Sequence, residues 1–243
     1  MHVMKADAHM VCTHTHSIIG EQMIHAGTQD TMISRVRNLF LVTLALGFAF
    51  GAVSNATAQN VTPPATPIDI TPPVGNTAFL VGHATGTQGY TCLPAANGGA
   101  AWNPTARPEA TLFTDVFGKP VQIITHFASI DEKPSTIAPK PVSLSGNATW
   151  QSSFDTSKVW AVKTGGIDAG TDSSCPNGGS IQCLLLQSIG NEVGPTGGKL
   201  LAKVTYVQRL NTNGGSAPTT ACSVGQTQLV PYTADYFFYQ KSE

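Results

Sequence analysis

Apolar and polar side chains alternate along most of the chain after residue 76, with a period close to two. In residues 121–127, for example, Val121, Ile123 and Phe127 share one face of an extended chain. Such alternation predicts β-strands, because successive side chains of a strand point to opposite faces. The runs predicted as strands are residues 77–83, 87–93, 110–115, 121–127, 148–151, 158–163, 183–188, 200–210 and 229–239. Between residues 59 and 243 no stretch of helical period is long enough to predict a helix.

Turn-forming residues separate these runs. Phe117-Gly118-Lys119-Pro120 lies between two of them and predicts a hairpin, and Asn213-Gly214-Gly215 lies between the last two. Many short strands joined by turns favour an all-β fold, which we predict to be a single antiparallel sandwich or barrel-like domain. In the last two runs, Tyr206 and Leu210 of one and Tyr236 of the other are expected to face a common core.

Residues 32–58 have the three parts of an export signal. Arg35 and Arg37 supply positive charge, and an apolar run of about a dozen residues follows them. Ala56-Thr57-Ala58 then fits the small-residue cleavage pattern. We predict that this signal peptide is removed after Ala58 and that the protein is secreted or periplasmic. The alternative, an uncleaved anchor, needs a longer apolar run, so no stable membrane span is expected after cleavage.

Residues 1–31 differ from the rest of the chain, since they show no sustained period and hold five of the seven histidines. Their Cys12, His14 and His16 combine a thiolate with imidazoles, which suits zinc or copper. The complete export signal that begins at Met32 favours another interpretation, in which these residues are a non-native N-terminal extension from an upstream start site. They would be removed with the signal, so we predict no metal site.

Composition limits what the remaining chain can do. Residues 59–76 are rich in proline and threonine, which predicts a stiff linker or a lead-in to the first strand and leaves residues 77–243 for the all-β domain. Only 11% of the residues are charged and the formal net charge is -1, so no basic surface field is available to recruit nucleic acid.

Four cysteines follow the export signal, and an even number in an exported protein predicts disulfides. Four cysteines allow three pairings, and free buried thiols are the alternative. Cys175 and Cys183 flank a short loop and could close it locally, which would leave Cys92 to pair with Cys222 and join the first strands to the last.

An ordered set of sequence blocks carries a family resemblance. VTYVQRLNTNGGSAP (residues 204–218) and VPYTADYFFY (residues 230–239), with GTQGYTC (residues 86–92) upstream, resemble the DUF3455 family of uncharacterised exported proteins of bacteria and fungi. The chain departs from the family pattern at residues 173–183, where a Pro-Trp is usual and two cysteines stand here. The resemblance implies no established activity.

Some fungal members of that family are labelled malate dehydrogenase, but the glycines here do not support a dinucleotide site. Gly82, Gly86 and Gly89 lack the G-x-G-x-x-G spacing, and no helix follows them. We therefore expect no cofactor and no dehydrogenase activity.

Glu109 and His126 are the first candidate site residues. They lie at similar distances from the turn of the predicted hairpin, so their side chains could converge. A histidine beside a carboxylate can perform acid–base chemistry or hold a metal, and the pair can equally form a structural hydrogen bond.

Trp150 and Arg209 complete the candidate ligand-binding residues. Exposed tryptophans and tyrosines can stack on a sugar or an apolar ligand, although packing in the core is the alternative for Trp150. Arg209 is expected to form a cross-strand ion pair with Asp235, and the other interpretation is that it binds the anionic group of a ligand.

These observations predict an exported β domain that acts as a binding or structural protein of the envelope or the extracellular space, with a small molecule or a glycan as its partner. The alternative is an enzyme that processes a small molecule or a glycan with the Glu109 and His126 pair.

Overall fold

Strands dominate the structure, a computed structural model that describes residues 61–96, 98–129 and 146–242. The strands are β1 (Asn76–Pro94), β2 (Ala100–Trp102), β3 (Arg107–Val116), β4 (Lys119–Ser129), β5 (Asn147–Ser152), β6 (Lys158–Ile167), β7 (Cys183–Glu192), β8 (Tyr206–Gly214) and β9 (Thr227–Lys241). A single short 3-10 helix, η1 (Ile68–Ile70), precedes them in these ranges. The all-β prediction is confirmed. The predicted extension, the export signal and its cleavage site lie outside the described residues.

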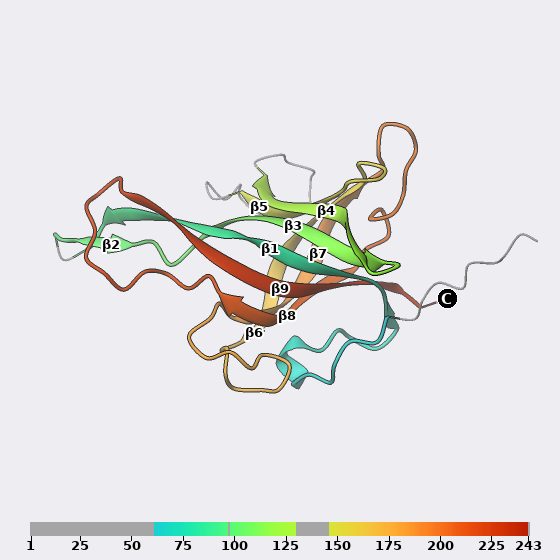
Figure 1. Ribbon diagram of the computed structural model, residues 1–243, viewed down its shortest axis with the longest axis horizontal. Coiled ribbons are helices and arrows are strands. Elements are labelled where there is room, and N and C mark those ends of the chain that lie inside the picture. The colour runs from blue at the N-terminus through green and yellow to red at the C-terminus, as the bar shows by residue number, and fades with distance from the viewer. Residues whose placement is uncertain (1–60, 97, 130–145, 243) are drawn as a thin grey trace, which may run out of the picture. The chain divides into compact units, whose positions relative to one another are not determined.

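All neighbouring strands are antiparallel, and their order is β2-β1-β3-β4-β5-β6-β7-β8-β9. In addition β1 pairs with β9 along almost its whole length, from Asn76 opposite Lys241 to Thr91 opposite Thr227. The sheet therefore rings round until its first long strand meets its last, and these two strands run side by side in Figure 1. This is the barrel-like form of the predicted domain.

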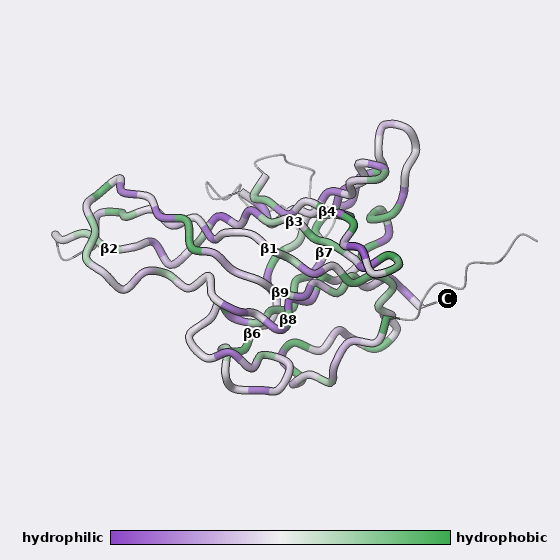
Figure 2. Tube along the Cα trace, in the orientation of Figure 1, coloured by the Kyte–Doolittle hydropathy of each residue, from purple (hydrophilic) through white to green (hydrophobic). Residues whose placement is uncertain are grey.

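The apolar side chains divide into two cores. The inner core fills the ring and includes Leu112, Trp150 and Phe238, none of them exposed. An outer core covers the other face of β7, β8 and β9, where Ile70 of η1 packs with Leu210 and both disulfide-bonded cysteines of the 175–183 loop. In Figure 2 the strands carry both hydrophobic and hydrophilic stretches.

The prediction that Tyr206 and Leu210 face the same core as Tyr236 is wrong. Tyr236 belongs to the inner core, whereas Tyr206 and Leu210 belong to the outer one, and Val207 is the β8 residue that packs in the inner core. The cause is that β8 is covered on both faces. The proline-rich segment lies against its outer face, held by a 2.6 Å hydrogen bond from Gln208 Nε2 to the carbonyl oxygen of Ile70.

Two disulfides join the four cysteines of the domain, Cys92 to Cys222 and Cys175 to Cys183. In this pairing the loop between Cys175 and Cys183 is closed locally, and β1 is joined to the segment that precedes β9. In the described ranges no helix has the length and apolar character needed to cross a membrane.

Candidate ligand-binding site

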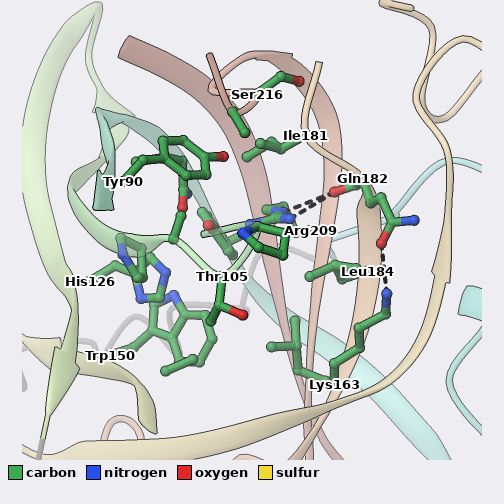
Figure 3. Close-up of a pocket in the computed structure, with 18 residues that line it drawn as sticks. Tyr90, Thr105, His126, Trp150, Lys163, Ile181, Gln182, Leu184, Arg209 and Ser216 are labelled. Atoms are coloured by element: carbon green, nitrogen blue, oxygen red, sulfur yellow. Dashed lines mark hydrogen bonds between the residues drawn. The ribbon is translucent and has the colours of Figure 1, made fainter. Parts of the chain in front are cut away.

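Beside its inner core the ring encloses a cavity of about 540 Å³, which we call the ring cavity. Its wall is formed by inward-facing side chains, including Tyr90, His126, Trp150, Leu186, Arg209 and Tyr236. Its mouth is formed by three loops that contribute residues 104–106, 181–182 and 216–217. Figure 3 shows Arg209 in the middle of this space, with Tyr90, His126 and Trp150 on one side and Gln182 on the other.

Strand register explains why these side chains meet. His126 of β4 lies directly opposite Trp150 of β5, and Arg209 of β8 lies directly opposite Tyr236 of β9. Residues opposite each other in an antiparallel pair point to the same face, which here is the inside of the ring. Three of the four predicted site residues, His126, Trp150 and Arg209, therefore line one cavity.

His126 is buried and neutral. Its ring stacks on the Trp150 ring with centroids 4.3 Å apart and planes 7° from parallel. Its Nδ1 lies 2.8 Å from the carbonyl oxygen of Thr149, which can only accept, so Nδ1 carries the proton and Nε2 is the acceptor. Burial lowers the pKa of His126 to about 3; the Thr149 carbonyl opposes this shift and the positive charge of Arg209 adds to it. The imidazole contributes no positive charge to the cavity near neutral pH.

Arg209 is held by a main-chain oxygen and by no carboxylate. Its Nε and Nη2 donate to the carbonyl oxygen of Gln182 over 3.1 and 2.8 Å. Within residues 61–96, 98–129 and 146–242, no carboxylate forms an ion pair with it. The predicted ion pair with Asp235 is wrong, because Asp235 lies opposite Leu210 and contacts His83 Nδ1 at 2.6 Å instead.

Among the described residues three buried side-chain donors lack a hydrogen-bond partner, Trp150 Nε1 and Gln88 Nε2 in the cavity wall and Trp160 Nε1 outside it. The Gln88 side chain lies near enough to Tyr232 to lower the pKa of that hydroxyl, although burial raises this pKa far more. Trp150 has no exposed surface. A buried donor without a partner costs about 1–3 kcal/mol, so such groups are rare in folded proteins and need an explanation.

The mouth of the cavity is organised by Gln182. While its main-chain oxygen holds Arg209, its side-chain oxygen accepts a 2.6 Å hydrogen bond from Lys163 Nζ. Its side-chain nitrogen donates to Asp168 over 2.7 Å. Opposite this residue, the Tyr90 hydroxyl donates to the carbonyl oxygen of Gly215 over 2.6 Å. Both sides of the mouth are thus tied to the strands beneath them.

Glu109 does not join His126, so the predicted acid–base pair is wrong. Ala110 lies opposite His126, whereas Glu109 lies opposite Phe127 and is exposed on the outer face. A β-bulge between Leu112 and Phe113 inserts one residue into β4, and a shift of one residue moves a side chain to the other face of a sheet. Without that bulge, Glu109 and His126 would have been partners.

Sequence reasoning did not identify Gln88 and Gln182. Gln88 could have been identified from the alternation, because Gly86, Gln88 and Tyr90 are alternate residues of β1 and share its inner face. Gln182 had none, because its role depends on its main-chain oxygen and on a loop that ends at Cys183.

The fold and the cavity define an antiparallel β domain that rings round a cavity of ligand size and carries two disulfides. Residues 73–240 match the family model described as "Protein of unknown function (DUF3455)", and the chain belongs to this family. No curated protein and no solved structure matches the chain. The disulfides are typical of proteins in an oxidising compartment outside the cytoplasm.

Proposed function

We propose that this protein is an exported binding domain that holds a small molecule in the ring cavity. The observation that carries the proposal is Arg209, a half-buried guanidinium that lines the cavity and forms no ion pair with a carboxylate of the described residues. A bound acceptor would pair with the N–H groups that Gln182 leaves free. The cavity volume of about 540 Å³ falls in the range of known sites for small molecules.

The balance of apolar and polar groups in the wall also supports binding. Leu184, Leu186 and Ile181 supply apolar surface, while Arg209 and Gln88 supply a small number of polar groups. Sites for small molecules usually combine an apolar wall with a few polar groups that fix the orientation of the ligand. Export to a secreted or periplasmic location is part of the proposal, supported by the two disulfides and by the predicted signal in residues 32–58.

The enzyme alternative is less well supported. The Glu109 carboxylate that would act with His126 is on the outside of the ring. His126 itself donates its only proton to Thr149 and has its pKa lowered to about 3, far from the value that suits a general base near neutral pH.

A ligand screen on the full-length chain, exported by its host and purified with both disulfides formed, tests the proposal. We expect at least one compound of a broad metabolite library to raise the unfolding temperature, because a ligand that binds only the folded state stabilises it. The Leu184→Trp variant fills the cavity and should lose the effect. The matched Leu229→Trp variant carries the same change at an exposed position of β9 and should keep it.

A library without any stabilising compound would contradict the proposal. So would a compound that stabilises the Leu184→Trp variant as much as the parent protein, since such a compound would bind elsewhere.

A further inference from the structure

We infer that the ligand is a small organic acid, and that Arg209 binds its carboxylate inside the ring cavity. This inference rests on the proposed function, because it names the chemical class of the molecule bound in the same cavity.

The guanidinium of Arg209 has donors to spare. An arginine has five N–H groups, and the two hydrogen bonds to Gln182 use one on Nε and one on Nη2. The second hydrogen of Nη2 and both hydrogens of Nη1 have no partner among the described residues. These lie along the end of the guanidinium, the edge that binds a carboxylate through two parallel hydrogen bonds.

The electrostatic balance of the cavity is also one-sided. Among the described residues that line it, none is an aspartate or a glutamate. A partly buried cation without a counterion is costly, and an anionic ligand would supply the missing charge. The N–H groups of Arg209 that Gln182 leaves free are donors, and an ionised carboxylate only accepts hydrogen bonds, so it matches them.

The rest of the wall distinguishes a carboxylate from a phosphate. Lys163, the second cation of the lining, donates one of its three N–H groups to Gln182, and its side chain is exposed to water. That leaves Arg209 as the half-buried cation of the wall, which matches the single charge of a carboxylate better than the nearly double charge of a phosphate monoester. The apolar side chains of Ile181, Leu184 and Leu186 then face the body of the ligand, which should be apolar or aromatic.

Arg107 gives a matched control for Arg209. It is the other arginine of the all-β domain, it is exposed, and it does not line the cavity. Arg107→Met and Arg209→Met therefore remove the same charge, but only one of them changes the cavity. Because Arg209→Met also leaves the Gln182 oxygen without its donors, Arg209→Lys serves as a second variant that keeps the charge and loses the two-point geometry.

The experiment uses full-length exported protein and a library in which each carboxylic acid is accompanied by its primary amide, with phenylacetate, 4-phenylbutyrate and hexanoate among the acids. Dissociation constants are measured by calorimetry for every compound that stabilises the protein. We expect acids to bind at least tenfold more tightly than their amides. Arg209→Met should weaken acid binding at least tenfold, Arg209→Lys should weaken it less, and Arg107→Met should leave it unchanged.

Three outcomes would overturn the inference. If the bound compounds are amides or other neutral molecules, or if acids bind Arg209→Met as tightly as the parent protein, the ligand is not held by its charge, while the proposed binding function stands. If no compound of any class binds, both the inference and the proposed function fail. Circular dichroism and the unfolding temperature of each variant confirm that it is folded before binding is compared.

Discussion

Arg209 donates two hydrogen bonds to the main-chain oxygen of Gln182, the residue directly before Cys183. Cys183 is joined to Cys175, so the oxygen that orients the guanidinium belongs to a covalently closed loop. The second disulfide has a similar position, because Cys222 lies in the segment between β8 and β9 that places Ser216 and Ala217 at the cavity mouth. Each disulfide therefore restrains one side of the site.

Removal of the two disulfides should affect stability and binding differently. By chain entropy, Cys175→Ser with Cys183→Ser should cost about 2–3 kcal/mol of stability, and Cys92→Ser with Cys222→Ser about 5 kcal/mol, since the second loop is far longer. We expect the first double variant to weaken ligand binding severalfold despite its smaller effect on stability, because the Gln182 oxygen loses its fixed position. Urea unfolding and calorimetry measure the two effects. Equal affinity in the first double variant and the parent protein would contradict this role of the loop.

The neutral state of His126 should make the domain less stable in acid. Burial lowers its folded pKa from 6.5 to about 3, so the unfolded chain binds more protons between these values. Its contribution to stability is fully present above about pH 6.5 and is lost as the pH falls toward 3. Between pH 7 and pH 4.5 the free energy of unfolding of the parent protein should fall by about 2 kcal/mol more than that of His126→Phe. Urea unfolding at the two pH values measures this difference.

His83→Gln is the control for that measurement. His83→Gln removes the other histidine of residues 77–243 and leaves the buried ring of His126 in place, so the acid sensitivity caused by His126 should persist. An identical pH dependence in His126→Phe and the parent protein would show that His126 is not the group responsible.

Gly86 should not tolerate a side chain. A Cβ at this position of β1 would overlap the carbonyl oxygen of Glu109 and the backbone of Ala110 on β3. We expect Gly86→Ala to destabilise the domain by about 2–3 kcal/mol through overpacking. The matched change Gly89→Ala, three residues along the same strand, meets its nearest atoms at 3.4 Å and should cost less than about 1 kcal/mol. Thermal or urea unfolding compares them, and similar losses would contradict the explanation.

Asp155 should act as an anchor between two loops. Its carboxylate accepts hydrogen bonds from Ser157 Oγ at 2.7 Å, from Ser157 N at 3.1 Å and from Leu200 N at 2.9 Å. Partial desolvation would raise its pKa, but the hydrogen bonds together lower it to about 2. We expect Asp155→Ala to cost about 2–3 kcal/mol by urea unfolding at pH 7, because three donors lose a charged acceptor.

The pH dependence of that loss checks the mechanism. A carboxyl group with a depressed pKa contributes stability above its unfolded value of 3.8, and the contribution is lost as the pH falls toward 2. The difference between Asp155→Asn and the parent protein should therefore be constant from pH 5 to 7 and shrink below pH 4. Asp69→Asn, which makes the same change at an exposed position of η1, is the matched control.

Much of the fold could be predicted because its causes are local. Alternation with a period of two identified the strands, and four cysteines after a predicted export signal indicated two disulfides. The pairing of β1 with β9 had no local signal, since it joins segments at opposite ends of the domain. The assignment of Tyr206 and Leu210 to the inner core failed because a strand with apolar residues on both faces does not show which of them faces inward.

The candidate site was predicted in part for the same reason. His126, Trp150 and Arg209 were identifiable as uncommon side chains within strand runs, and strand register brings them to one cavity. The prediction placed Glu109 on the wrong face because β4 contains one inserted residue. Such a bulge does not disturb the alternation within short runs, so the alternation cannot reveal it.

The pairing of β1 with β9 also determines when this domain can fold. The first strand to be synthesised has the last one as its neighbour, so a nascent chain that lacks residues 227–241 leaves β1 and β8 with open edges. Contacts between such distant segments form late and slowly. If the predicted signal in residues 32–58 directs the chain through an export channel, the ring can close only after residues 227–241 have emerged from it.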